Sequence, residues 1–459
     1  MSKKDNAKQN SKPVNALLMP IVNANAAGID VSATMHAVAV PLDRDNEPVK
    51  EFGAFTEDLH AIAQWLLKCR ITTVAMESTG VYWKQLFVVL LQYGFNVSLV
   101  NARHVKNVTG RKTDMDDAQW IQKLHSCGLL NSSFLLDDAT ESLRALVRHR
   151  KSLIDDSSKY ILRMQKSLEL MNIKIHSVIA DIGGKTGTAI IKAIISGQRD
   201  PASFMQYINS RIKADKDTLL KSLTGNWREE QLFLLEQNYE LHLSMQKSIA
   251  ISDAKIESFL QMQAAVNTEG VIEQEPGPEA AKNKKNKKKT NKNTPDFDVQ
   301  AYLLKIHRID VTQIYGISNG AALSILAETG TDLSKWESEN HFVSWLNLCP
   351  NNKITGGKVI SSMVMSRKAG NATQAFRAAA NSLQRSDHWL GDYFRRMKSK
   401  GGNKYAIVAT ARKLAIIYYK MVRYKKDFSP MDTDEYREKY KSAKIAYLEK
   451  QLTKLKAAV

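Results

Sequence analysis

The sequence is poor in cysteine and contains no long hydrophobic run. Three cysteines occur among 459 residues, Cys69, Cys127 and Cys349, and no two of them have C-x-x-C spacing. This scatter excludes a disulfide framework and a cysteine-based zinc site. No stretch approaches the roughly 18 consecutive apolar residues of a membrane-spanning helix, and the N-terminal segment lacks the apolar core of a signal peptide. We therefore expect no membrane partner and a cytoplasmic location.

Acidic residues are outnumbered by basic ones. Lysine and arginine number 66 against 47 aspartate and glutamate residues, which gives a net charge of +19 and a pI near 9.5. Seven lysines lie between Lys282 and Lys292, and without them the net charge would still be +12. A basic excess of this size favours nucleic acid or an anionic membrane surface. Because no membrane-spanning segment is predicted, nucleic acid is the expected partner.

The chain is long enough for two or three domains, and its first part has an α/β pattern. Residues 1–26 are polar and basic at first, and we expect a disordered arm there. Residues 27–130 alternate strand-like and helix-like segments, which predicts a layered α/β domain. Helices are expected over residues 59–68 and 81–93, and a strand over Asn96–Val100.

Residues 131–263 lack strand patterns and show helical spacing instead. Such spacing is typical of two long helices that pair as a coiled coil, with each other or with another protomer. An ordinary helical-bundle core explains it equally well, because three or four clean heptads are not present. Two series carry the pattern: Ile161, Met164, Leu168, Met171, Ile175 and Val178, then Met245, Ile249, Ile256 and Phe259.

Residues 264–300 are rich in glutamate and proline and then in lysine and asparagine, which predicts a disordered linker. A second, mainly α-helical domain is expected over residues 301–430, followed by a C-terminal helix over residues 431–459. Within that domain, Gly316 and Gly320 lie in a helix-turn-helix-like hairpin, where exposed backbone N–H groups would suit phosphates. A tight turn without a ligand is the alternative.

Four carboxylates occupy positions that suit one shared site. Asp30 interrupts an alternating apolar run, and Glu77 follows the apolar residues 71–76, so each is expected on a β-strand. Asp114 and Asp117 lie at i and i+3 of an expected helix and would project from one face. Mg²⁺ prefers oxygen ligands, and two ions about 3.5–4 Å apart can stabilise the attacking and leaving oxygens at a phosphodiester. The pattern predicts a metal-dependent site that cleaves nucleic acid.

Each of these acids also has a purely structural explanation. An aspartate at a strand end is often a turn former, and Asp114 would serve as the N-cap of a helix over residues 115–124. The combination favours a shared site. A strand, hairpin, strand, helix, strand and helix, with acids on the first and fourth strands, is the order of an RNase H-like fold.

Five segments along the chain carry a family likeness. GIDVS, AMESTGVYW, LVNARHVKNVTGRKTDMDDA, LCPNNKITGGK and ARKLAIIYYKM occur in this order between about residue 27 and about residue 430. Together they resemble the DEDD transposases of the insertion-sequence family numbered one hundred and ten, recombinases with a RuvC-like domain that use a bridge RNA. The KTDxxDA signature and the spacing of Asp30 from Glu77 are the most specific parts. The resemblance implies a Mg²⁺-binding centre of Asp30, Glu77, Asp114 and Asp117.

Residues 351–357 read NNKITGG, and we expect a polar, glycine-containing loop with a hydroxyl at Thr355. In the resembled family, the position five residues after the proline is a serine that attacks DNA and forms a covalent phosphoserine link. Threonine here departs from that pattern, because Cβ branching crowds the hydroxyl. A threonine can still be a nucleophile when a base or a metal activates it. The alternatives are a structural turn at Thr355, an inactive domain, or attack by Ser361, Ser362 or Ser366.

Cationic residues surround and follow this loop. Clustered lysine and arginine beside glycine suit contact with a phosphate backbone. For any single lysine, a solvated helix surface is the simpler explanation. The expected nucleic-acid contacts are Gly316, Gly320, Lys358, Arg367, Lys368, Arg377, Arg395, Arg396, Lys404 and Arg412.

The resemblance implies a DNA transposase or recombinase of an insertion sequence. Mg²⁺ at the acidic centre would polarise the scissile phosphate, and Thr355 would attack it. Donor DNA, target DNA and a structured guide RNA are the expected partners of a homo-oligomer, a dimer or tetramer, associated with a bacterial nucleoid. Two other classes remain open: a RuvC-like structure-specific nuclease that uses water as its nucleophile, and a nucleic-acid-binding regulator without catalytic activity.

Overall fold

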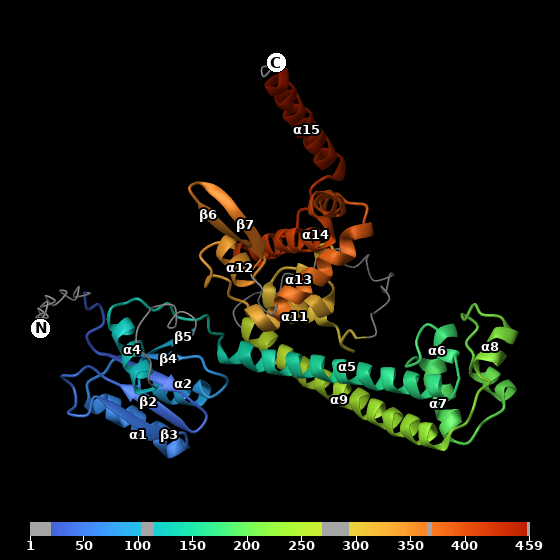
Figure 1. Cartoon of the computed structure of the whole chain (residues 1–459), viewed down its shortest axis with the longest axis horizontal. Coiled ribbons are helices and arrows are strands. Elements are labelled where there is room, and N and C mark those ends of the chain that lie inside the picture. Colours follow the sequence, from blue (N-terminus) through green and yellow to red (C-terminus); the bar gives the residue numbers. More distant parts are fainter. Residues whose placement is uncertain (1–19, 102–113, 269–292, 365–369, 457–459) are drawn as a thin grey trace, which may run out of the picture. The chain divides into compact units, whose positions relative to one another are not determined.

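The computed structural model describes residues 20–101, 114–268, 293–364 and 370–456 (Figure 1). The chain divides into two compact units, Met1–Leu135 and Leu136–Val459, here called unit 1 and unit 2. Unit 1 contains a mixed sheet with helices, and unit 2 is helical apart from one hairpin. None of the described helices is long and apolar enough to cross a membrane.

Unit 1 is built on a five-stranded sheet of order β3-β2-β1-β4-β5. The first three strands pair antiparallel, whereas β4 and β5 run parallel to β1. The strands are β1 Ala26–Val31, β2 Met35–Ala39, β3 Val49–Gly53, β4 Thr73–Glu77 and β5 Asn96–Val100. The helices are α1 Thr56–Lys68, α2 Trp83–Gln92 and α4 Asp114–Ser126. These elements confirm the predicted α/β domain.

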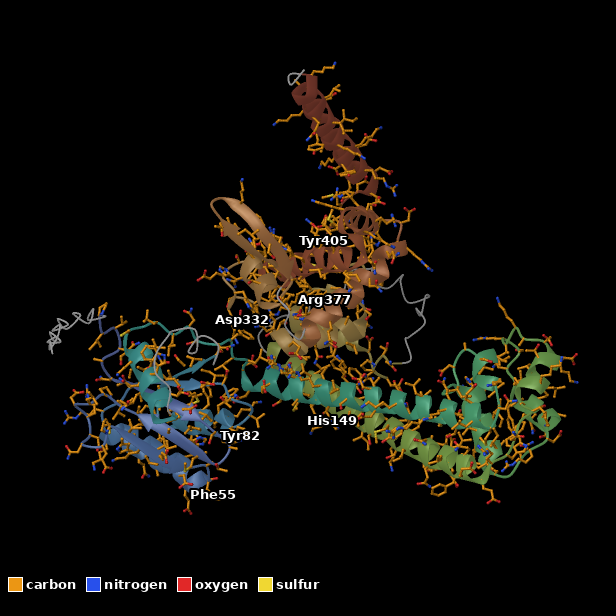
Figure 2. All side chains as sticks on the ribbon, in the orientation of Figure 1. Phe55, Tyr82, His149, Asp332, Arg377 and Tyr405 are labelled. Atoms are coloured by element: carbon orange, nitrogen blue, oxygen red, sulfur yellow. The ribbon has the colours of Figure 1, made fainter. Side chains whose placement is uncertain are left out.

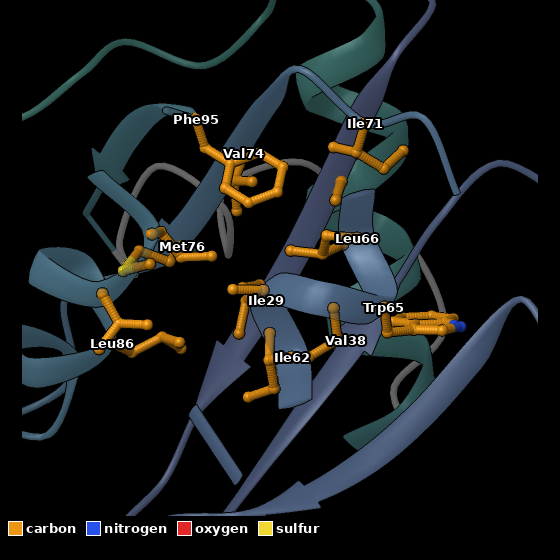
Figure 3. Packing of buried hydrophobic residues seen from close by; sticks show 14 of the residues in the cluster. Ile29, Val38, Ile62, Trp65, Leu66, Ile71, Val74, Met76, Leu86 and Phe95 are labelled. Carbon is orange, nitrogen blue, oxygen red and sulfur yellow. The ribbon is translucent and has the colours of Figure 1, made fainter. Parts of the chain in front are cut away.

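Helices cover both faces of this sheet. On one face, the buried side chains of Ile29 and Met76 pack with Ile62 and Leu66 of α1 and with Leu86 of α2 (Figure 3). On the other face, Ala75 and Val100 pack against Ile121 and Leu124 of α4. Strand residues alternate between the two faces, so neighbouring positions of β1 and β4 serve different helices.

The N-terminal arm ends earlier than the sequence predicts. The backbone N–H groups of Val22 and Asn23 donate hydrogen bonds to the Ser126 oxygen at the end of α4, at 2.8 and 2.9 Å. The predicted disordered arm over residues 1–26 is therefore wrong at its end, because this segment is anchored by α4. Residues 1–19 lie outside the described part of the chain.

Two long helices of unit 2 pair with each other, α5 Asp138–Leu170 and α9 Glu229–Thr268 (Figure 1). Their interface includes buried polar groups. Arg150 makes a bidentate ion pair with Asp253, and Ser157 contacts His242 Nδ1 at 3.0 Å. Gln246 Nε2 also donates to the Ser157 hydroxyl at 2.9 Å. The pair is therefore not a continuous apolar seam.

The first predicted apolar series does not lie on one helix. The helix α5 ends at Leu170, and Asn172 takes a left-handed φ of 55°. Ile175 and Val178 belong to a separate short helix. The residues of the series are apolar because they all pack into one shared core, not because they lie on one helix face. That core also includes residues of the helices α6 Ile175–Val178, α7 Lys185–Ile195, η1 Pro201–Tyr207, α8 Lys216–Ser222 and α9.

The predicted linker over residues 264–300 is shorter in the structure. The helix α9 continues to Thr268, the Asn293 oxygen accepts a hydrogen bond from Arg150 Nη1 at 3.0 Å, and Pro295 is buried. Pairing with α5 supports the longer α9, and the hydrogen bond from Arg150 of α5 anchors the end of the segment at Asn293. Residues 269–292, which carry the lysine run, lie outside the described part.

The C-terminal region packs on the long helix pair. Glu328 of α11 is buried and accepts two hydrogen bonds of 2.8 Å from Arg148 of α5, which ties the two together. The elements are α10 Val299–His307, η3 Val311–Gln313, α11 Asn319–Thr329, α12 Glu339–Trp345, β6 Pro350–Thr355, β7 Lys358–Val364, α13 Asn371–Ser382, η4 Leu383–Arg385, α14 Trp389–Tyr424 and α15 Thr433–Lys456.

Candidate active site

Asp30 and Glu77 lie at the carboxyl ends of neighbouring parallel strands. The last registered pair of β1 and β4 is Ile29 with Met76, so the next residue on each strand is one of the two acids. Ile29 and Met76 are buried against α1 and α2. Because side chains alternate along a strand, Asp30 and Glu77 point to the opposite face, where α4 lies. Both acids are partly exposed.

The helix α4 crosses β1 in the opposite direction. Gln122 Nε2 donates to the Ala26 oxygen at 3.3 Å, while a Cβ added to Gly28 would collide with the Ala118 oxygen. A Cβ on Gly28 would also collide with Gln122 N, so Gly28 lies level with the turn 118–122, and two residues forward on a strand span about the same length as four residues on a helix, ~6–7 Å. Two residues forward from Gly28 is Asp30, and four residues back from the turn 118–122 are residues 114–118, so the first turn of α4 lies near the level of Asp30.

The helix places Asp114 and Asp117 on its first turn, as predicted, with Asp114 as its first residue. Asp117 is partly exposed, and the side chain of Asp114 is outside the described part. Among the described side chains, no group of three or more His, Cys, Asp or Glu residues is close enough to hold a metal ion. The convergence of all four carboxylates stays a prediction. Carboxylate oxygens at adjacent strand ends are donors that suit a hard divalent cation.

A threonine beside Glu77 was not singled out by the sequence. Thr79 Oγ1 donates a hydrogen bond to Glu77 Oε1 at 3.0 Å. The backbone N–H of Ser78 donates to the Val100 oxygen of β5 at 3.0 Å, which fixes the chain as it leaves β4. The position of a hydroxyl two residues after the acid is the signal that could have revealed this contact.

Thr355 lies at the tip of a two-stranded hairpin. The strands β6 and β7 pair antiparallel, and Thr355 is registered with Lys358 across the turn. The turn consists of Gly356 and Gly357, whose φ values of 55° and 74° suit a type I′ turn that favours glycine. The predicted loop over residues 351–357 is therefore wrong for residues 351–355, which belong to β6, and holds for the two glycines. Cross-strand pairing extends through Thr355, which is exposed.

The alternative nucleophiles lie away from the tip. Ser361 and Ser362 are in β7, registered with Lys353 and Asn352. Ser361 is partly buried and Ser362 is exposed, while Ser366 lies outside the described residues. The turn thus presents the Thr355 hydroxyl beside two glycines, where a bulky substrate has more room.

Comparison with protein families gives two matches. Residues 27–173 match the DEDD family of IS110 type, described as Transposase, and residues 310–395 match the Transposase IS116/IS110/IS902 family. The chain belongs to this transposase family. The first match contains all four carboxylates, and the second contains Thr355. Comparison with curated proteins gave no match. As a transposase, the chain is a DNA-cleaving and recombining enzyme, and DNA is its substrate.

Several cations that were expected to contact nucleic acid have partners within the transposase. Arg395 Nη1 donates to the Ser386 oxygen at 2.9 Å, and Arg412 Nη2 donates to Asn340 Oδ1 at 3.3 Å. The Arg396 guanidinium lies over the Tyr440 ring, 4.5 Å from its centroid. These contacts bind the three arginines to their own fold.

Other expected contacts are more open. Lys358, beside Thr355 at the hairpin tip, and Lys404, just after the break of α14 at Gly401 and Gly402, are exposed. Arg377 of α13 is partly buried. Arg367 and Lys368 lie outside the described residues. The exposed lysines are therefore better placed for phosphate contact than the paired arginines.

The two glycines before and within α11 differ in their surroundings. Gly316 has a φ of 86°, and a Cβ added there would lie 2.7 Å from the Ala379 oxygen of α13. Packing alone thus explains glycine at this position. Gly320 lies in the first turn of α11 and has open space around its Cα. A phosphate would have room to approach the α11 terminus at Gly320.

Proposed function

We propose that this transposase exchanges DNA strands through two chemical centres, the acidic cluster of unit 1 and the Thr355 hydroxyl of unit 2. The observation that carries the proposal is the position of Asp30 and Glu77 at adjacent parallel strand ends on the face covered by α4. If Asp30 and Glu77 only stabilised the fold, two neighbouring strands would not need to end in partly exposed acids on the same face.

The acidic centre is proposed to be RNase H-like, of the RuvC type. The strand order β3-β2-β1-β4-β5, with β2 antiparallel to both neighbours, supports this assignment. Asp30, Glu77, Asp114 and Asp117 would hold Mg²⁺. When bound, Mg²⁺ would polarise the scissile phosphate and offset charge on the attacking and leaving oxygens. The protein contributes by holding the carboxylates in place, Glu77 through its hydrogen bond from Thr79 and α4 through its contact with Gly28.

Thr355 is the proposed nucleophile. Its oxygen attacks the phosphorus, a phosphothreonine ester forms, and a deoxyribose oxygen leaves and takes up a proton. Attack by the hydroxyl of a second strand reverses the step and joins that strand. One ester replaces another each time, so strand exchange needs no external energy source. The exposed hairpin tip gives the phosphodiester access to the hydroxyl.

The resemblance further suggests a bridge RNA that specifies donor and target DNA, and a dimer or tetramer that holds them. The net charge of +19 supports polyanion binding but does not distinguish RNA from DNA. Association with a bacterial nucleoid follows from the same reasoning and stays a prediction.

Substitution of the four carboxylates tests the acidic centre. Asp30→Asn, Glu77→Gln, Asp114→Asn and Asp117→Asn should each abolish strand exchange that depends on divalent ions and leave DNA binding largely intact. Glu51→Gln is the matched control, because Glu51 is an exposed acid on the edge strand β3. Full activity in any of the four variants would remove that residue from the centre.

A further inference from the structure

We propose that Tyr82 forms a nucleobase-stacking site beside Glu77, on which the transposase holds an unstacked base of its DNA. The inference rests on the proposed acidic centre for its role in strand exchange. Neither the carboxylate pattern nor the expected basic contacts includes this residue. The site lies in residues 78–82, which join β4 to α2.

The backbone of this segment positions the aromatic ring of Tyr82. Gly80 has a left-handed φ of 54°, and a Cβ added there would lie 3.2 Å from Cε2 and 3.3 Å from Cδ2 of Tyr82. The ring therefore lies against the Cα of Gly80. A side chain at position 80 would push the ring away and would also strain the backbone.

The same segment is fastened to the acidic centre. Thr79, directly before Gly80, donates its hydrogen bond to Glu77 Oε1 at 3.0 Å. Two contacts thus connect the Tyr82 ring with the Glu77 carboxylate. The ring packs against Gly80, and Thr79, the residue before Gly80, donates a hydrogen bond to Glu77. A base stacked on Tyr82 would lie near the phosphate that Glu77 helps to process.

Tyr82 is not needed for the core of unit 1. Its side chain is 46% exposed, and Val81 beside it is 67% exposed. Figure 2 labels Tyr82 among the side chains of unit 1. The next residues of α2 supply the packing: Trp83 meets Phe87 edge to face at 5.8 Å, and Leu86 is fully buried. Two large, exposed side chains directly after a candidate catalytic strand end point to a ligand rather than to folding.

A nucleobase is the ligand that fits best. In open α/β sheets, ligands bind outside the carboxyl ends of the parallel strands, which is where β4 ends. The substrate is DNA, and every base offers a flat face to an aromatic ring regardless of sequence. Val81, the preceding residue, adds exposed apolar surface to the segment, which suits an unstacked base better than a charged phosphate.

A protein partner is the competing occupant of this surface. Val88 and Leu91 of α2 are also exposed, at 45% and 49%. A protein interface would extend along α2 over the exposed residues Val88 and Leu91, whereas a base would use only the end next to Glu77. Leu91 therefore provides a matched control, since it is as exposed as Tyr82 and lies in the last turn of the same helix.

The test uses the full-length transposase and single-stranded oligonucleotides of mixed sequence that contain 2-aminopurine. Stacking on an aromatic ring quenches 2-aminopurine fluorescence. Without divalent ions, Tyr82→Ala should lose the quenching and weaken binding about tenfold. Tyr82→Phe and Tyr82→Trp should retain both, because the ring and not the hydroxyl stacks. Leu91→Ala should behave like the wild type.

The outcomes separate this proposal from the proposed function. Unchanged quenching and affinity in Tyr82→Ala would overturn the stacking site. Equal losses in Tyr82→Ala and Leu91→Ala, with a change in oligomer mass, would assign the surface to a protein partner and also overturn it. Strand exchange is measured separately with divalent ions. If Tyr82→Ala loses quenching while all four carboxylate variants keep full strand exchange, the stacking site stands and the acidic centre fails.

Discussion

Gly28 of β1 lies directly against the backbone of Ala118 in α4. A Cβ on Gly28 would stand 2.8 Å from the Gln122 Cα and closer still to the Ala118 oxygen. This contact sets the level at which α4 crosses β1, and with it the level of Asp114 and Asp117 relative to Asp30. A strand glycine often marks such a close approach of another backbone.

Gly28→Ala should therefore impair both folding and chemistry. The neighbouring atoms are backbone, so α4 must move away from the sheet. We expect a loss of about 1–3 kcal/mol in unfolding free energy, measured with urea, together with loss of strand exchange. Gly370→Ala is the control, since a Cβ there meets nothing within 4 Å. A stable and active Gly28→Ala variant would contradict the proposed placement of α4.

Thr355→Val should eliminate any covalent adduct between protein and DNA. Valine keeps the branched shape and the hairpin while removing the oxygen, and the position is exposed, so the fold should persist. Thr355→Ser should retain or raise activity, because the unbranched hydroxyl is less crowded.

Mass spectrometry of a trapped complex locates the adduct. Phosphate on Ser361, Ser362 or Ser366 would move the nucleophile to that residue. Full activity of the valine variant would make Thr355 structural. If the wild type cleaves DNA with Mg²⁺ and forms no adduct, water is the attacking group, and the protein acts as a nuclease.

Binding to DNA or structured RNA should weaken strongly as salt rises. Lysine and arginine contacts release counterions from the nucleic acid, so the logarithm of affinity falls linearly with the logarithm of salt concentration. Deletion of residues 279–292, which removes the lysines from Lys282 to Lys292 and leaves Asn293 in place, should weaken binding modestly, lower that slope and leave recombination possible. An affinity that does not change with salt would argue against polyanion binding.

His307 should make unit 2 less stable in mild acid. Complete burial, with a smaller effect from the Lys425 charge, lowers the pKa of His307 to about 3. The unfolded chain takes up a proton below about pH 6.5, while the folded histidine stays neutral. Stability is thus fully present above pH 6.5 and falls by up to about 1.4 kcal/mol per pH unit below it, down to about pH 3.

His307→Gln tests this pH dependence. The substitution removes the titrating ring, which stands 6.1 Å from the buried Tyr418 ring between their centroids. Whatever its stability at pH 7, the variant should lose less unfolding free energy than the wild type between pH 7 and pH 5. Equal losses in the two proteins would assign the acid sensitivity to other groups.

The sequence by itself determined which residues carry the proposed chemistry. An acid in an alternating apolar run marks Asp30, the spacing of Asp114 and Asp117 places them on one helix turn, and two adjacent glycines mark the turn after Thr355. These signals are local, because strand alternation, helix periodicity and glycine turns depend on neighbours in the chain. The α/β domain followed from the same local patterns, whereas the family likeness rested on the resemblance of five sequence segments to a known family.

Only the tertiary structure decided which of these residues meet and which cations are free. Asp30 and Glu77 are 47 positions apart in sequence, with β2, β3 and α1 between their strands, and the parallel pairing of β1 with β4 makes them neighbours. Sequence periodicity likewise does not encode three other sets of contacts. These are the contact of the Tyr82 ring with Gly80, the close approach of α4 that requires Gly28, and the internal partners of Arg395 and Arg412. The apolar series that is interrupted at Asn172 shows why periodicity is not sufficient. Burial in a shared core selects apolar residues whether they lie on one helix or on two, so their spacing does not reveal where one helix ends.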